Sequence, residues 1–207
     1  LMLYFNFVSA APLSTFSGNF FEGFEGTGYT NVGWNTVDGR TWNPDSTTAY
    51  NGTQALDAKG AMTSLAWLEY NLSTVKYTNI VFSAWYRNTD NIEGADQQFL
   101  SWYNETSWVN VMNTSANLAA YNLSNNTLTA GANNNPNFRI RLGCYVDSPS
   151  EHCYFDDVRV RGTLITAPQV QFVGPTTPAG SYSQNYIVAN VTATGTSLDK
   201  IRIFLYN

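Results

Sequence analysis

Two acidic segments, far apart in the sequence, limit what this chain can fold into more than any other feature. Residues 20–26 (FFEGFEG) set carboxylates among aromatic side chains, and residues 155–160 (FDDVRV) place Asp156 and Asp157 in a run that alternates apolar and polar residues. The two acidic segments can meet only if the first and last strands of one domain pair, which is how an antiparallel sandwich closes. Oxygen ligands gathered there suit a hard cation such as Ca²⁺. The sequence therefore predicts that both ends of one β-domain lie side by side.

Period-two alternation of apolar and polar residues indicates several further strands. We predict strands at residues 77–87, 98–104, 108–112, 138–145 and 154–161. Residues 65–72 fit a short helical turn or a strand equally well. Polar segments rich in Gly and Asn, at residues 88–96, 113–126 and 130–137, are expected to be loops. Because there is no long helix-period run and no βαβ pattern, the predicted fold class is all-β, an antiparallel jelly-roll β-sandwich.

Composition supports this class and narrows the possible partners. Charged residues make up only 12% of the chain and aromatic residues 15%, as is typical of secreted all-β proteins in which aromatic side chains fit a pleated surface. The net charge of −5 disfavours nucleic acid and anionic membranes, since both require a basic face.

The two cysteines, Cys144 and Cys153, flank a turn-rich segment that contains Pro149. Strand-like runs lie on both sides, so the pair is expected to form a disulfide that staples a β-hairpin. The spacing is not that of a zinc motif, and the single histidine, His152, cannot complete a zinc ligand set. A disulfide implies an oxidising compartment.

Acceptor motifs for N-linked glycans indicate the same setting. Their density in the middle of the chain favours a glycan-decorated extracellular surface. The motifs begin at Asn51, Asn71, Asn104, Asn113, Asn122, Asn125 and Asn190.

The sequence pattern at both ends of the chain differs from that of its middle. Residues 1–11 are apolar and too short to span a bilayer, so they read either as a signal-peptide remnant or as a mature strand donated to a neighbouring subunit. Residues 168–207 contain three strand-like runs, at 168–176, 185–192 and 201–206. They predict the opening of an immunoglobulin-like sandwich, which needs about seven strands.

Residues 18–162 resemble extracellular jelly-roll modules of the MAM and galactose-binding-like kind, the latter including carbohydrate-binding modules and concanavalin A-like domains. The matching pieces are short: residues 24–26 (FEG), 33–34 (GW), 52–56 (GTQAL), 82–86 (FSAWY), Trp108 and 155–160 (FDDVRV). The resemblance implies a structural Ca²⁺ held by Glu25 and Asp157, with Asp57 or Gly52 as further contributors. The four-cysteine framework of animal MAM domains is missing.

The tail resembles immunoglobulin-like repeats of archaeal cell-surface proteins. Such repeats often follow jelly rolls, so this resemblance implies a modular surface protein.

The candidate site residues each have a structural alternative. Glu25 and Asp157 could instead cap turns or pair with Arg159 or Arg161, and a regular strand would point Asp156 and Asp157 to opposite faces.

Trp34, Trp42, Trp85 and Trp108 are expected in the core. Trp102 or Tyr103 could line a sugar-binding face near Asn104 and Arg87, or belong to the core or to a glycan-shielded surface.

We therefore expect a non-catalytic extracellular module that binds carbohydrate or mediates adhesion and contains a structural calcium ion. Its partners would be glycans or surface proteins. One alternative is a stalk or filament subunit that associates with copies of itself. A second alternative is an accessory module of a larger secreted hydrolase. No catalytic residues are predicted: His152 has no evident nucleophile, and no pair of carboxylates lies in a context typical of glycosidases.

Overall fold

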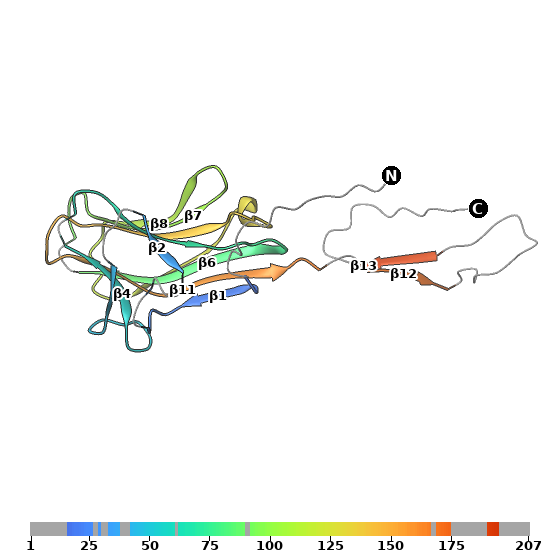
Figure 1. Cartoon of the computed structure of the whole chain (residues 1–207), viewed down its shortest axis with the longest axis horizontal. Helices are drawn as coiled ribbons and strands as arrows, with labels where there is room; N and C mark the ends of the chain where they lie inside the picture. Colours follow the sequence, from blue (N-terminus) through green and yellow to red (C-terminus); the bar gives the residue numbers. More distant parts are fainter. Residues whose placement is uncertain are drawn as a thin grey trace, which may run out of the picture. The chain divides into compact units, whose positions relative to one another are not determined.

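The structure is a computed structural model that describes residues 16–26, 29, 33–37, 42–60, 62–89, 92–166, 169–174 and 190–194. The chain divides into two compact units, Leu1–Leu164 and Ile165–Asn207. The first unit is a sandwich of two antiparallel sheets (Figure 1). The apolar segment at residues 1–11 lies outside the described residues.

The larger sheet, here called the β11 sheet, has the strand order β3-β4-β11-β6-β9, with β1 also paired to β11. The long strand β11 pairs with β4 along its first residues and with β1 along its later ones, while β6 lies on its other side. The strands of this sheet are β1 (Asn19–Glu22), β3 (Trp42–Asp45), β4 (Ala55–Lys59), β6 (Tyr77–Asn88), β9 (Asn122–Thr127) and β11 (His152–Leu164).

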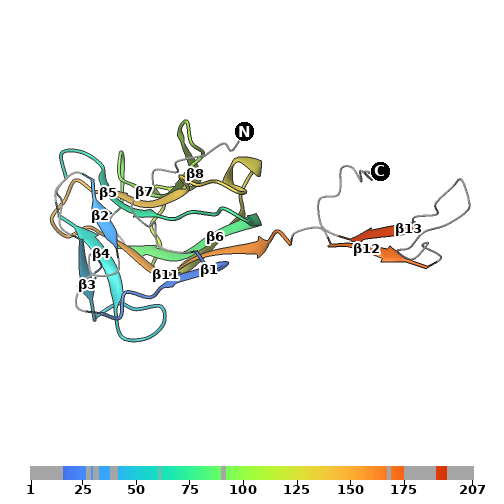
Figure 2. The same cartoon turned by 45° about the vertical axis from the view of Figure 1, so that its right-hand side comes forward.

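The second layer, here called the β10 sheet, has the order β2-β5-β10-β7-β8 and lies over the β11 sheet (Figure 2). A short 3₁₀ helix, η2 (Ala130–Ala132), precedes β10 in the chain. The strands of this sheet are β2 (Trp34–Thr36), β5 (Ala66–Asn71), β7 (Gln97–Tyr103), β8 (Trp108–Thr114) and β10 (Arg139–Tyr145).

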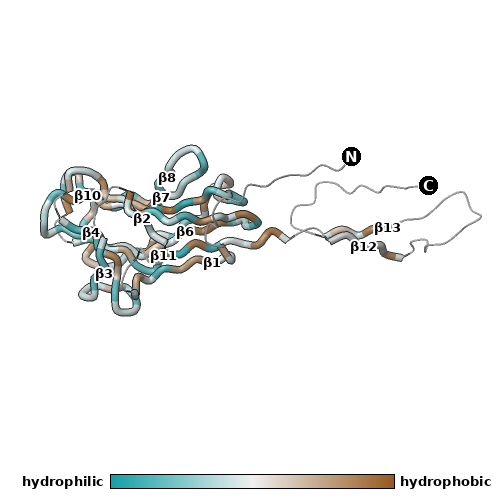
Figure 3. The backbone as a smooth tube through the Cα atoms, in the orientation of Figure 1, coloured by the Kyte–Doolittle hydropathy of each residue, from teal (hydrophilic) through white to brown (hydrophobic). Residues whose placement is uncertain are grey.

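Alternation along the strands fills the space between the two layers with apolar side chains. Along β6, Ile80, Phe82 and Ala84 are fully buried, whereas the residues between them face outward. Figure 3 shows how hydrophobic and hydrophilic residues alternate along the strands. Each fully buried large side chain contributes roughly 1.5–3 kcal/mol. The largest of them are Trp34, Trp42, Trp102, Phe82, Phe138 and Phe155.

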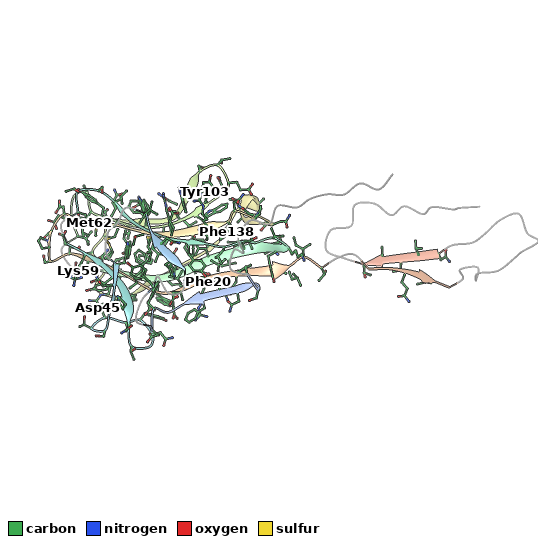
Figure 4. All side chains as sticks on the ribbon, in the orientation of Figure 1. Phe20, Asp45, Lys59, Met62, Tyr103 and Phe138 are labelled. Atoms are coloured by element: carbon green, nitrogen blue, oxygen red, sulfur yellow. A yellow bond between two sulfur atoms is a disulfide. The ribbon has the colours of Figure 1, made fainter. Side chains whose placement is uncertain are left out.

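The pairing of the front and end strands is confirmed. In the antiparallel ladder of β1 and β11, Asn19 lies opposite Arg161 and Glu22 lies opposite Val158. Phe20 on β1, labelled in Figure 4, packs inward against Tyr70 and Trp34. The ladder therefore holds the start of the domain against its last strand, while these aromatic contacts anchor β1 to the β10 sheet.

A bulge in β11 changes the orientation of the two adjacent aspartates. The register against β6 shifts between Asp156 and Arg159, and Asp157 adopts a left-handed backbone conformation with φ of 46°. Asp156 bonds to a loop on the outer side of the sheet, and Asp157 lines a groove on that same side. The expectation that they point to opposite faces is wrong, because the extra residue of a bulge interrupts the alternation of a regular strand.

The disulfide between Cys144 and Cys153 is present, with the two Cα atoms 6.0 Å apart. It does not staple a hairpin, however, because Cys144 belongs to β10 and Cys153 to β11, and these strands lie in different sheets. Both cysteines are fully buried. The bond therefore joins the two layers across the core.

The second unit is described over one antiparallel strand pair. β12 (Gln169–Val173) pairs with β13 (Asn190–Thr194), so that Gln169 lies opposite Thr194. These strands overlap the first two of the three predicted at this end, and the third, at residues 201–206, lies outside the described residues.

No helix in the described part of the chain is long and apolar enough to cross a membrane.

Candidate functional site

A groove of about 600 Å³ opens on the outer face of the β11 sheet. We call it the outer groove. Its floor comes from β6, β9 and β11, and one wall comes from the loop between β3 and β4. The residues that line it are Tyr50, Asn51, Ser83, Trp85, Leu123, Asn125, Asp157, Arg159 and Arg161.

Asp156 fixes the loop that forms this wall. Its Oδ2 accepts hydrogen bonds from the backbone N–H groups of Tyr50 at 2.8 Å and Asn51 at 3.1 Å, and its Oδ1 accepts one from Asp157 at 2.7 Å. Asp156 is fully buried. Desolvation by burial raises the pKa of its carboxyl to about 6, although the three N–H donors oppose that shift.

An aromatic stack forms the apolar part of the outer groove. The rings of Tyr50 and Trp85 lie 3.7 Å apart and nearly parallel, at 15°. Tyr121 meets the Tyr50 ring edge-on at 5.7 Å, and its hydroxyl donates to the Thr48 carbonyl at 3.2 Å. Tyr50 is nevertheless 42% exposed. The stack therefore presents a fixed but accessible aromatic ring.

Two arginines form the polar end of the outer groove. Arg159 donates to Asp157 at 3.3 Å, and its guanidinium carbon lies 4.4 Å from the centre of the Phe21 ring. Arg161 is exposed two positions further along β11. Within the described part of the chain, Arg161 takes part in none of the ion pairs.

The predicted calcium ligands are brought together only in part. Glu25 lies against the loop after Asn51: its carboxylate accepts the Thr53 hydroxyl at 2.7 Å and the Thr53 N–H at 3.0 Å. These hydrogen bonds lower the pKa of Glu25, and the bond from the Thr53 hydroxyl has the largest effect. A side chain at Gly52, whose φ is +72°, would collide with this carboxylate.

Two backbone carbonyl oxygens lie beside Glu25. The side-chain amide of Gln54 donates to both of them, to the Phe24 oxygen at 3.0 Å and to the Gly26 oxygen at 3.1 Å. Backbone carbonyl oxygens are ligands that a hard cation accepts. Asp157 lies next to this segment, since its Oδ1 is 3.6 Å from where a Cβ of Gly23 would be.

Asp57 does not belong to this group. It is 1% exposed and both of its oxygens lie 3.0 Å from His152 Nδ1, with Lys59 at 4.0 Å. Desolvation by burial raises the pKa of Asp57, and His152 opposes the shift. Asp57 is therefore engaged by His152 and Lys59 rather than by the segment that contains Glu25.

Among the described residues, one cluster brings three carboxylates together: oxygens of Glu93, Asp147 and Glu151 lie within 4.8 Å of one another. Glu25 and Asp157 do not belong to this cluster. Glu25 and Asp157 therefore fit a cation only together with backbone carbonyl oxygens.

The outer face of the β10 sheet carries a different aromatic arrangement, which we call the arginine ladder: Trp67, Arg141, Trp108, Arg139 and Tyr103. The guanidinium carbon of Arg141 lies 3.7 Å from the Trp67 ring centre and 4.1 Å from that of Trp108. Arg139 lies 4.0 Å from Tyr103 and 5.2 Å from Trp108. These cation–π contacts cover ring faces that would otherwise stack on a ligand.

The predicted sugar contacts do not lie together. Trp102 is 1% exposed and packs on Phe138 in the core, so its expected role as a ligand contact is wrong. Tyr103 lies on the opposite face of the same strand, where it borders a hollow of about 410 Å³. Arg87 lies on β6 in the other sheet, with its guanidinium carbon 6.0 Å from the Tyr154 ring.

Two tryptophans expected in the core belong to the outer faces. Trp85 floors the outer groove, and Trp108 belongs to the arginine ladder. In β6, Trp85 alternates with the buried Ala84 and Phe82. Because neighbouring residues of a strand face opposite sides, assigning Ala84 to the core would have placed Trp85 on the outer face. Trp34 and Trp42 are buried as predicted.

The predicted glycan acceptors lie at the surface. Asn51, Asn71, Asn113, Asn122, Asn125 and Asn190 are exposed, and Asn104 is half-buried. Asn104 accepts backbone N–H groups of Thr106 and Ser107 through its Oδ1.

No protein-family description and no curated protein sequence matches this chain. Solved structures with the same jelly-roll fold include carbohydrate-binding modules and adhesin domains. The K2 cleaved adhesin domain of Lys-gingipain superposes with a TM-score of 0.52 at 17% identity, covering 69% of this chain and 98% of the adhesin. A xylan-binding family 22 carbohydrate-binding module from Paenibacillus barcinonensis gives 0.50 at 12% identity, covering 71% and 95%. TmCBM61, solved with β-1,4-galactotriose, gives 0.52 at 11% identity, covering 68% and 94%. At these identities the likeness establishes an antiparallel jelly-roll β-sandwich.

Proposed function

We propose that this chain is a non-catalytic extracellular module that binds carbohydrate through the outer groove. The observation that carries the proposal is the exposed Tyr50 ring, held on Trp85 beside two asparagine amides. A flat aromatic ring stacks on the C–H face of a pyranose, and the amides of Asn51 and Asn125 can donate to and accept from its hydroxyls. The groove also falls within the usual size of ligand sites, about 300–1,000 Å³.

The likeness to carbohydrate-binding modules and an adhesin domain supports the same class of function. The arginine ladder is the less suitable surface, since its guanidinium groups already cover its rings. An extracellular setting is supported by the disulfide and by the exposed acceptor asparagines.

A binding test separates the two faces. We expect Tyr50→Ala to weaken binding to glycans by about tenfold, the size of one lost aromatic stack. Tyr103→Ala is the matched control, because it removes a tyrosine from the other sheet. Affinity is measured by glycan array and then by calorimetry. Loss of binding in Tyr103→Ala, with Tyr50→Ala unaffected, would refute the assignment to the outer groove.

A structural calcium ion is the second part of the proposal. Glu25 and Asp157, with the carbonyls of Phe24 and Gly26, would hold the ion beside the wall of the outer groove. When bound, Ca²⁺ supplies positive charge that ties the start of the domain to β11.

This part is tested without any glycan. Adding Ca²⁺ at 100 times its Kd to chelated protein should stabilise the fold by about 2.7 kcal/mol, because the ion binds only the native state. The melting temperature should then rise in the wild type and stay unchanged in Glu25→Gln, while Glu69→Gln should respond as the wild type does. A wild-type melting temperature that ignores Ca²⁺ would end the calcium proposal and leave glycan binding untouched.

A further inference from the structure

Resting on the proposed function, we infer that the saccharide bound in the outer groove is acidic, with a carboxylate recognised by Arg161 and assisted by Arg159. The inference starts from the positions of these arginines. They are two residues apart in the regular part of β11 beyond the bulge, so both point outward on the same side. Both are exposed, and both line the groove that holds Tyr50 and Trp85.

The charges in the groove leave one cation available. Asp157 lies within 3.3 Å of Arg159 and neutralises part of its charge. Asp156 is buried beneath the wall loop and engaged by three N–H donors. No carboxylate among the described residues pairs with Arg161. The groove therefore has a net positive lining on a chain whose net charge is −5.

Guanidinium chemistry narrows the ligand to a carboxylate-bearing sugar. Arginine presents donors in a planar fork that matches a carboxylate with two parallel hydrogen bonds. Arg159 is held in place by the Phe21 ring and by Asp157. Its side chain therefore loses less conformational entropy when a ligand binds. A neutral sugar would use the aromatic ring and the amides but would leave this fork without an anionic partner.

The experiment uses matched pairs that differ only in charge. The probes are polygalacturonate, polyglucuronate and hyaluronan, each beside its fully methyl-esterified form. The protein is produced in a host that adds no N-glycans, so that Asn51 and Asn125 stay unmodified. We expect at least one acidic polymer to bind about tenfold more tightly than its ester, the usual scale of a charge-assisted hydrogen bond. We also expect this preference to shrink as salt is raised.

The variants locate the preference on β11. Arg161→Gln should reduce the acid-to-ester affinity ratio to near one, and Arg139→Gln, on the opposite sheet, should preserve it. Melting temperatures show that both variants are folded.

The failures are distinguishable. Equal binding of acid and ester that Tyr50→Ala abolishes would overturn the inference and support glycan binding in the groove. An acid preference that Arg161→Gln leaves intact would overturn the assignment to β11. Binding to none of the six polymers would overturn the inference, whereas the proposed function is decided separately by the glycan array.

Discussion

Asp156 is a buried carboxylate on which both the wall of the outer groove and the bulge in β11 depend. It holds the wall of the outer groove through two loop N–H groups and stabilises the bulge through a third. Holding the carboxylate in this place removes it from solvent, and this desolvation raises its pKa to about 6. Because the folded-state pKa lies above the ordinary value, Asp156 contributes most to stability when it is protonated, and that contribution is lost as the pH rises through about 6.

Asp156→Asn should remove this dependence on pH. The amide never becomes charged, and because it has one acceptor oxygen in place of two, the hydrogen bonds that it loses are lost equally at every pH. The stability of the variant relative to the wild type should therefore improve by at most about 3 kcal/mol between pH 4 and pH 7. Urea denaturation at four pH values in this range measures the difference. A difference that stays constant with pH would show that Asp156 is ionised at no cost.

Single residues were predictable where one physical rule decided them. Trp34 and Trp42 are buried, and Tyr103 and Trp102 fall on opposite faces of β7, as alternation requires. The surroundings of Asp57 and Asp157 could not be predicted in this way. The partner of Asp57 is His152, 95 positions away, and the orientation of Asp157 depends on a bulge that no local pattern reveals.

At the scale of elements, strands with an apolar inner face were the ones that the sequence could identify. β6, β7, β8, β10 and β11 overlap their predicted ranges. β9 was predicted to be a loop, because its sequence NLSNNT has almost no apolar residues. It is an edge strand that pairs with β6 alone, through its backbone. A strand that pairs at a sheet edge through its backbone need not show alternating apolar and polar side chains, so periodicity does not reveal it.

The disulfide is the element-scale feature with the clearest energetic consequence. Its cysteines are separated by nine positions, and a loop of that size adds about 2.5 kcal/mol on the chain-entropy account. Cys144→Ala combined with Cys153→Ala should lower the free energy of unfolding by about that amount. Urea denaturation measures it, with wild type reduced by dithiothreitol as the control. A double variant as stable as the oxidised wild type would contradict this account.

At the scale of the whole molecule, two of the predicted glycan acceptors lie in the outer groove. Asn51 and Asn125 each begin an acceptor motif, and both line the groove. A glycan on either one would fill the space that a ligand needs. The fold class could be foreseen from the sequence, but this overlap could not, since it depends on a loop folding back over β6 and β9.

Thr127→Val tests the competition without altering a groove residue, because it removes the acceptor motif of Asn125 and keeps the asparagine. Produced in a glycosylating host, this variant should bind glycans several-fold more tightly than wild type. Ser115→Ala, which removes the motif of Asn113 on the other sheet, is the control and should change nothing. Equal affinity of Thr127→Val and wild type, with Asn125 shown by mass spectrometry to be modified in the wild type, would contradict the overlap.

The position of β11 also bears on how the protein is made. This strand is the last of the first unit along the chain, yet it pairs with β1, β4 and β6 and carries one half of the bond between the layers. On a ribosome, its neighbours in that sheet emerge early and must wait without their shared partner. Non-local pairing of this kind slows folding. The ladders of β3 with β4 and of β6 with β9 can form earlier, but the sheet is complete only after residue 164 has left the exit tunnel.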